Sequence, residues 1–253
     1  MMQLGLVTYQ WGAEWDLPTL IRNCQKTGFR GVELRTTHKH GVEPSLNAAQ
    51  RQEVTKRFAD SGVELVGLGT VCEFQAADPA VVKKNIEDAK SFIRLAHDVG
   101  GSGIKVRPNG LPAGVPLAQT LEQIGKSLDE IASFGEGYGI EIRLEIHGRG
   151  TSEIPNIRKI MDVSKHPNSK LCWNCNAEDL AGAGLAANFT SVQERLGTIH
   201  IHDLISSYPW RELFGLLKKA NFNGWTLLEE GSQTSDPLRV MQYYRLLWET
   251  MVA

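Results

Sequence analysis

Residues 140–149 read IEIRLEIHGR, and apolar and polar side chains alternate along them until the sequence turns polar and glycine-containing. This alternation predicts a strand in which Glu145 and His147 project from one face, opposite Leu144 and Ile146. A carboxylate and an imidazole thus stand two residues apart at the C-terminal end of a strand. When apolar strands alternate with helices in a barrel, functional side chains gather at that end.

Two later stretches have the same ending. Residues 198–204 read TIHIHDL and residues 225–231 read WTLLEEG, so each is a short apolar strand that runs into His or Glu. Three strands with a common ending indicate one shared site. An isolated Glu and His on a solvent-facing edge strand would not repeat in this way.

The same kind of unit recurs along the whole chain. Eight apolar strands alternate with about eight amphipathic helices, the strands being expected near residues 4–9, 31–35, 63–69, 103–107, 140–147, 171–174, 198–201 and 225–228. Continuous apolar strands between helices indicate a parallel sheet covered by helices. Eight units favour a closed (β/α)8 TIM barrel, a single α/β domain over residues 1–253, rather than an open doubly wound sheet. No GxGxxG motif follows the first strand, which argues against a dinucleotide-binding fold.

Composition excludes several partners. The chain has 253 residues and a formal charge of −2, so it offers no electrostatic case for nucleic acid or an anionic membrane. No apolar run is long enough for a membrane span, and the N-terminal MMQLGLVTYQW does not resemble a signal peptide. Four scattered cysteines predict a reduced, cytoplasmic protein, in which the CxxC of Cys172 and Cys175 lacks a second pair to complete a zinc site. Assembly into a homo-oligomer is compatible with the sequence.

If the barrel closes, four polar residues end strands five to eight: Glu145, Asn174, His202 and Glu229. Two carboxylates and an imidazole that converge would repel unless neutralised, so a divalent cation is the expected occupant. Mixed nitrogen and oxygen ligands suit Mn, Co, Mg or Zn alike. Glu145 and Glu229 are also the expected catalytic acid/base pair.

Further polar residues are candidates for substrate binding. His38 follows the second strand and is expected either at the rim or in a solvated loop. Arg107 shares a strand face with Lys105, and two cations inside a barrel need an anionic partner, which Glu33 or a substrate carboxylate or phosphate could supply. His147 is expected to contact substrate or to orient Glu145.

His200 has the same strand parity as His202 but lies one layer deeper. It is therefore expected to be a core histidine.

Three motifs in order, LEIHG, HIHD and GWTLLEEG, resemble those of the xylose-isomerase-like TIM barrels, the sugar phosphate isomerase/epimerase superfamily. The resemblance covers essentially the whole chain. It implies that Glu145, His202 and Glu229 are metal ligands. The family usually supplies an Asp after strand six, where this chain reads WNCNAED. Asn174 is the expected replacement with Asn176 near the substrate, although a shifted register would make Asn176 the ligand.

The resemblance implies a metal-dependent isomerase or epimerase of a small sugar or ketose that works through an enediolate. The same enolate chemistry also suits a lyase or dehydratase acting on a 3-oxo sugar, a glycoside or an inosose. Endonuclease activity on DNA would need additional metal ligands and a more basic surface. A non-catalytic sugar-binding barrel is the remaining alternative, because the Asp is missing.

Overall fold

Eight parallel strands alternate with helices from one end of the chain to the other, as the sequence predicts. The structure, a computed structural model, describes residues 1–253. The strands are β1 (Gln3–Val7), β2 (Gly31–Arg35), β3 (Glu64–Glu73), β4 (Gly103–Arg107), β5 (Glu141–Glu145), β6 (Ser169–Trp173), β7 (Leu196–Ile201) and β8 (Trp225–Leu228). The α-helices are α1 (Leu17–Thr27), α2 (Ala48–Ala59), α3 (Pro79–Asp98), α4 (Leu117–Glu136), α5 (Ile154–Val163), α6 (Leu185–Val192), α7 (Trp210–Lys219) and α8 (Pro237–Val252), and two short 3-10 helices are η1 (Ala177–Leu180) and η2 (Gln193–Arg195).

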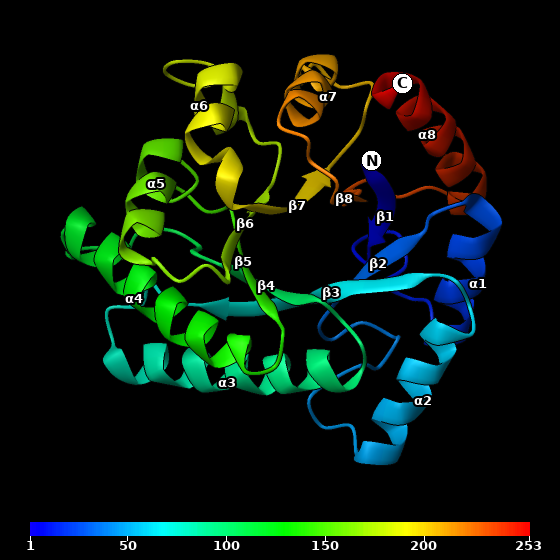
Figure 1. Cartoon of the computed structure of the whole chain (residues 1–253), viewed down its shortest axis with the longest axis horizontal. Coiled ribbons are helices and arrows are strands. Elements are labelled where there is room, and N and C mark those ends of the chain that lie inside the picture. The colour runs from blue at the N-terminus through cyan, green and yellow to red at the C-terminus, as the bar shows by residue number, and fades with distance from the viewer.

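The strands close into a barrel in sequence order. Each pairs in parallel with the next, and β8 pairs with β1, where Leu6 lies opposite Leu228. The helices lie around the strands in Figure 1. The predicted single (β/α)8 barrel is therefore confirmed.

Local sequence signals explain why the helices form where they do. In α1, Asp16 accepts a hydrogen bond from the backbone N–H of Thr19, Pro18 lies in the first turn, and Gly28 ends the helix in a left-handed conformation. Its buried face includes Leu20 and Cys24, both fully buried. Each helix of this kind covers the outside of the barrel and leaves the strand ends to form the site.

Three irregularities in the strand register adjust side chains near the C-terminal ends of the strands. They fall between Val32 and Glu33, between Gly69 and Glu73, and between Leu171 and Cys172. Bulges of this kind bend a strand and redirect the side chains beside it. β3 also runs to Glu73, four residues beyond the predicted end, so it projects past the barrel beside β4.

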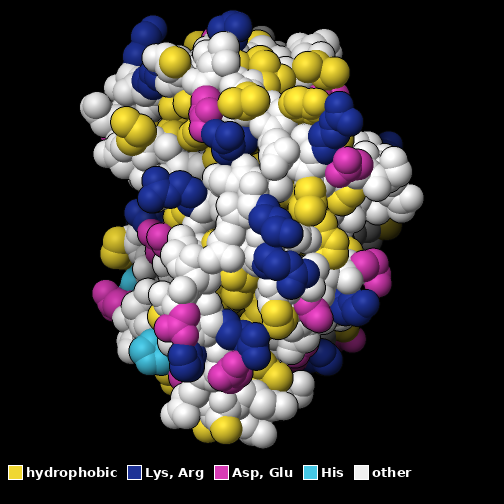
Figure 2. All heavy atoms as spheres, turned by 90° about the vertical axis from the view of Figure 1, so that its right-hand side faces the viewer, with side chains coloured by type: hydrophobic (Ala, Val, Ile, Leu, Met, Phe, Trp, Pro, Cys, Tyr) yellow, Lys and Arg dark blue, Asp and Glu magenta, His cyan; other side chains and the backbone are white.

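The outer surface carries charges of both signs. On the face in Figure 2, which includes the side of α1 and α8, basic and acidic side chains lie among apolar ones. No helix is both long enough and apolar enough to cross a membrane.

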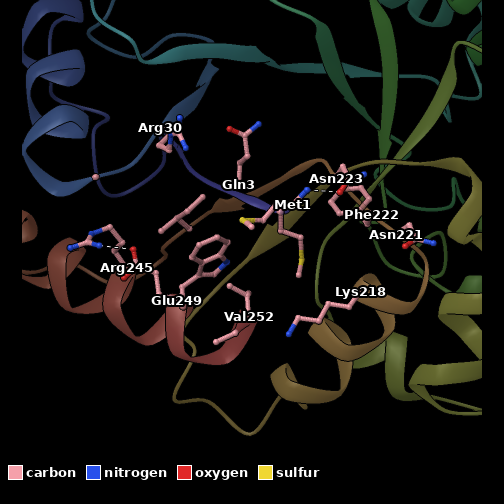
Figure 3. Close-up of a pocket in the computed structure, with 15 residues that line it drawn as sticks. Met1, Gln3, Arg30, Lys218, Asn221, Phe222, Asn223, Arg245, Glu249 and Val252 are labelled. Atoms are coloured by element: carbon pink, nitrogen blue, oxygen red, sulfur yellow. Dashed lines mark hydrogen bonds and ion pairs between the residues drawn. The ribbon is translucent and has the colours of Figure 1, made fainter.

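A cavity of about 890 Å³ lies at the N-terminal ends of the strands. Its lining includes Gln3 at the start of β1, Asn223 just before β8, and Trp248 of α8 (Figure 3). It is thus at the opposite end of the barrel from the polar strand endings, and it is not the candidate site.

Candidate active site

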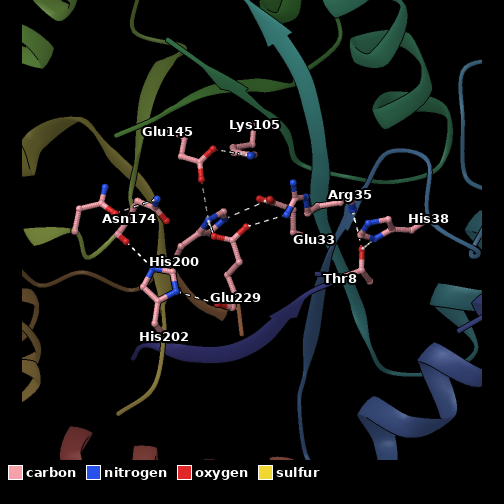
Figure 4. Close-up of polar contacts among 11 residues, drawn as sticks. Thr8, Glu33, Arg35, His38, Lys105, Glu145, Asn174, His200, His202 and Glu229 are labelled. Carbon is pink, nitrogen blue, oxygen red and sulfur yellow. Dashed lines mark hydrogen bonds and ion pairs between the residues drawn. The ribbon is translucent and has the colours of Figure 1, made fainter. Parts of the chain in front are cut away.

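Three side chains direct one donor atom each to a common point inside the barrel. They are Glu145 at the end of β5, His200 in β7, and Glu229 directly after β8 (Figure 4). Nδ1 of His200 lies 3.6 Å from Oε1 of Glu145 and 3.5 Å from Oε2 of Glu229. The donor atoms of the three residues all lie within 4.8 Å of one another.

The second oxygen of each glutamate is held by a cation. Lys105 of β4 donates to Oε2 of Glu145 at 2.6 Å, and both side chains are almost completely buried. Arg35 at the end of β2 lies 3.5 Å from Oε1 of Glu229, and its guanidinium covers the ring of Tyr9 at 4.4 Å. Each carboxylate is thereby oriented so that its other oxygen faces His200.

The second nitrogen of His200 faces a third carboxylate. Nε2 lies 3.3 Å from Oε1 of Glu33, which is 1% exposed and has no hydrogen-bond partner on either oxygen. A side chain at Gly69 would meet that oxygen at 3.0 Å, so the glycine leaves room for it. If Nε2 carries the proton toward Glu33, Nδ1 presents a lone pair to Glu145 and Glu229.

The charges of this cluster shift the pKa values of its members. Burial alone would raise the pKa of Glu145, but Lys105 and His200 hold it well below its usual value. Burial also opposes ionisation of Glu229, yet His200 lowers its pKa to about 2. For His200, burial disfavours the charged ring, but Cys172, Glu33 and Glu229 raise its pKa well above the ordinary value. Both glutamates are therefore ionised at neutral pH.

The arrangement fits a divalent cation. Metal–ligand bonds of about 2.0–2.2 Å to nitrogen and oxygen place two ligands as much as about 4.4 Å apart, so a small contraction of the three donors would enclose an ion. Oδ1 of Asn174, which directly follows β6, is buried and has no hydrogen-bond partner, and neither ring nitrogen of His200 has one. Two fixed cations face three carboxylates here, so added positive charge is favoured.

His202, the expected ligand, lies elsewhere. Its Nε2 is 2.7 Å from the carbonyl oxygen of Asn174, and its Nδ1 is 2.9 Å from that of Glu229. β7 ends at Ile201, so the alternation that would point His202 inward stops one residue too early. The structure therefore brings His200, expected in the core, to the two glutamates, and it gives His202 two backbone partners that link the ends of β6 and β8.

The two asparagines after β6 have different positions. Asn174 is 5% exposed and keeps its side-chain oxygen free, whereas its amide nitrogen lies 3.5 Å from Oδ1 of Asn176. Asn176 donates to the carbonyl oxygen of Ile146 at 2.6 Å, and its backbone N–H donates to Asp179. Asn176 thus ties the loop after β6 to the loop after β5, which leaves Asn174 as the asparagine with a free side-chain oxygen.

The remaining candidates lie around the rim. His38 approaches the hydroxyl of Thr8 at 3.3 Å and lies on the Arg35 side of the cluster (Figure 4). Arg107 pairs with Glu73 at 3.9 Å. His147 is partly buried, and its Nδ1 has no partner. Lys105 and Arg107 therefore obtain their anionic partners from β5 and β3, not from Glu33.

Sequence reasoning missed Arg35 altogether and did not assign Glu33 to the site. Both belong to GVELR, whose alternation puts Glu33 and Arg35 on one face of β2. That shared face was the available signal. All four cysteines are buried and free, and burial raises the pKa of the Cys172 thiol, so the CxxC forms neither a disulfide nor a thiolate pair.

Comparison with known proteins identifies the family to which the chain belongs. The model of the xylose isomerase-like TIM barrel family matches residues 21–244. The structure is similar to 3-keto-D-glucoside 4-epimerase YcjR from E. coli (TM-score 0.84, 15% identity, covering 99% of this chain and 100% of that one). It is also similar to D-psicose 3-epimerase from Clostridium cellulolyticum H10 (TM-score 0.86, 16% identity, covering 99% of this chain and 99% of that one). A third similar structure is the IolI protein with a bound zinc atom (TM-score 0.83, 14% identity, covering 99% of this chain and 98% of that one). At these identities the likeness establishes the fold alone.

Proposed function

The chain belongs to the xylose isomerase-like TIM barrel family, and from that premise we propose that it is a metal-dependent isomerase or epimerase of a small sugar or ketose. One observation carries the proposal: an oxygen of Glu145, an oxygen of Glu229 and Nδ1 of His200 converge in a buried, charge-rich site at the C-terminal end of the barrel. The sugar epimerases among the similar structures and the zinc of IolI agree with it.

Glu145, His200 and Glu229 would hold the ion, with Oδ1 of Asn174 as the fourth donor. This donor set suits Mn, Co, Mg or Zn. A divalent ion supplies Lewis acidity that polarises a carbonyl and offsets the negative charge of an enediolate.

The two glutamates would move the protons. Both are held ionised, the form that a general base requires, and they approach from β5 and from the end of β8. One takes the proton from the carbon beside the substrate carbonyl, and the other, once it has taken up a proton from solvent, delivers that proton from the opposite face or to the neighbouring carbon. The first outcome is epimerisation and the second is isomerisation.

Lys105 and Arg35 keep each glutamate in place during that transfer. Since each cation binds one carboxylate oxygen, the other oxygen of Glu145 or Glu229 stays directed at the point where the two glutamates and His200 converge. Positioned carboxylates avoid the entropy cost of finding the reactive geometry at each turnover.

Proton exchange with solvent tests the proposal. The purified protein, loaded with Mn²⁺, is incubated in deuterated water with a panel of ketoses and 3-oxo sugars, and NMR follows the label. We expect deuterium at the carbon beside the carbonyl of at least one sugar, recovered as intact sugar. A smaller or unsaturated product would instead identify a lyase. Sugar binding without label in any compound would identify a binding protein.

Substitution of the proton carriers is the matched control. Glu145→Gln and Glu229→Gln should each lower the exchange rate by at least about a hundredfold, because an amide cannot accept the proton. Turnover within about tenfold of wild type in either variant would remove that residue from the mechanism.

A further inference from the structure

Four buried polar atoms without partners gather at one side of the barrel mouth. They are Oε2 of Glu73, Oε1 of Gln75, Nε of Arg107 and Nδ1 of His147. Glu73 ends β3 and Arg107 ends β4, where the two are directly opposite in the register, and His147 follows the neighbouring strand β5. An unpaired buried donor or acceptor costs about 1–3 kcal/mol. Four at one rim indicate a ligand that completes them.

The charge of this group is already balanced. Nη2 of Arg107 lies 3.9 Å from the same Oε2 of Glu73, which is too far for a hydrogen bond but close enough for the guanidinium to have an anionic partner within the protein. A phosphate or carboxylate placed here would meet the Glu73 carboxylate as well as Arg107. The group therefore suits a neutral ligand better than an anion.

The kinds of free atoms specify the ligand further. Glu73 and Gln75 offer oxygens that can only accept a hydrogen bond, whereas Nε of Arg107 can only donate one. A hydroxyl group donates and accepts at once, so neighbouring hydroxyls of a sugar ring can satisfy both kinds. A purely apolar group would leave all of them unpaired.

Of the four residues, Gln75 also lines a cavity of about 650 Å³, with Asn109, Arg149 and Glu153 elsewhere in its wall. The loops that form it are fixed to each other, because the backbone N–H of Gly110 donates to Thr151 at 3.0 Å. Thr151 in turn donates to the carbonyl oxygen of His147 at 2.9 Å. The space is thus preformed, and both polar and apolar groups line it.

We propose that this side of the mouth is a subsite for a second, uncharged sugar ring or polyol group, so that the substrate is a neutral glycoside and not a sugar phosphate. The inference rests on the proposed function for the position of the reacting ring. Glu73, Gln75, Arg107 and His147 bind the hydroxyls of the group nearest the reacting ring, and the cavity beyond Gln75 takes the rest.

Binding measurements separate this inference from the catalytic proposal. Calorimetry on the Mn²⁺-loaded protein compares glucose, glucose 6-phosphate and a panel of neutral glucose disaccharides with different linkages. At least one disaccharide should bind about tenfold or more tightly than both monosaccharides, as one or two additional buried hydrogen bonds would give. If no disaccharide exceeds glucose, or if glucose 6-phosphate binds most tightly, the subsite is refuted, whatever the proton-exchange result.

A pair of variants tests the residues. Gln75→Leu keeps the size of the side chain and removes its acceptor, and it should abolish most of the disaccharide preference. The matched control is Gln233→Leu, an exposed residue at the other side of the mouth, beyond β8. An equal effect of the two substitutions on the ratio of disaccharide to glucose affinity would overturn the assignment.

Discussion

Glu33 has no hydrogen-bond partner on either oxygen and lies 3.3 Å from the His200 nitrogen that faces away from the two glutamates. A carboxylate in this position fixes which nitrogen of a metal-binding histidine carries the proton. We expect Glu33→Gln to lower Mn²⁺ affinity about 10- to 100-fold, since an amide both weakens the orientation of His200 and removes a negative charge. Calorimetric titration of the apo-protein measures the change.

The control for that experiment is Glu64→Gln, at the exposed first residue of β3. It makes the same chemical change far from the cluster and should leave Mn²⁺ affinity as it is. Melting in the presence of a chelator shows whether Glu33→Gln still folds. Unchanged affinity in a folded Glu33→Gln protein would mean that the carboxylate does not act through His200.

Asn174 directly follows β6, and its buried side-chain oxygen has no hydrogen-bond partner. If the site holds a divalent ion as proposed, Asn174→Asp adds one negative charge beside it in a partly desolvated site. The gain should be at least about 1–2 kcal/mol, roughly tenfold or more in Mn²⁺ affinity. Asn176→Asp should give less, because Asn176 is occupied by the carbonyl of Ile146. Equal titration curves for the wild type and Asn174→Asp would exclude Asn174 as a ligand.

The histidine pair shows where prediction from single residues stops. Strand alternation gives His200 and His202 the same direction, and nothing in TIHIHDL marks the point where β7 ends. The end depends on contacts from other strands, since His202 is held by carbonyl groups at the ends of β6 and β8. Similarly, Arg35 reaches Glu229 only because β2 and the end of β8 lie near each other after closure.

At the level of the strands, the packing of the barrel interior relies on one large side chain, Arg143, which lies against glycine residues of the neighbouring strands. Arg143 of β5 is 4% exposed and donates to the carbonyl oxygen of Val66 and to Ser102, both at 2.9 Å. A Cβ atom at Gly67 would lie 2.7 Å from the carbonyl oxygen of Gly103 and 3.2 Å from Arg143. Arg143 therefore connects β3, β4 and β5 only where glycine leaves the space.

We accordingly expect Gly67→Ala to destabilise the fold by about 1–3 kcal/mol, because backbone cannot move aside as a flexible side chain can. Gly215→Ala is the matched control, since a Cβ there has nothing within 4 Å. That change lies inside α7 and should be neutral or stabilising by up to about 1 kcal/mol. Urea unfolding of both variants gives the two values. A Gly67→Ala protein as stable as wild type would show that the interior is loosely packed there.

The architecture of the whole molecule followed from the sequence better than the site did. Eight strands with the same period, separated by helices, leave few ways to bury both faces of the sheet, and a closed barrel is the one adopted. Glu145 and Glu229 could be placed at the ends of β5 and β8 because the end of an apolar strand shows in its own sequence. Contacts between side chains of different strands, such as Lys105 with Glu145, depend on register and barrel shear, which no local pattern reports.

Asp179 in η1 makes the stability of the whole molecule depend on pH. It is completely buried, and its Oδ2 accepts hydrogen bonds from Tyr208 and from the backbone of Asn176, both at 2.9 Å. Burial outweighs these bonds and raises the pKa of Asp179 to about 7 from a usual 3.8. Between these two values the folded protein holds a proton that the unfolded chain has lost, so this residue makes stability fall as pH rises through that range.

Asp179→Asn keeps the acceptor for Tyr208 and Asn176 and cannot ionise, so it should remove that dependence. At pH 8 the variant should have a larger free energy of unfolding than wild type. Between pH 8 and pH 5 that difference should fall by roughly 2–3 kcal/mol, because the wild-type carboxyl gains its proton over about two pH units in which the unfolded chain stays ionised. Urea unfolding of both proteins at the two pH values measures this difference. The other titrating groups are the same in the two proteins, so their contributions cancel. Asp162→Asn, an exposed change in α5, should show no such pH-dependent gap. A gap for Asp179→Asn that stays constant from pH 5 to pH 8 would mean that Asp179 ionises normally in the folded protein.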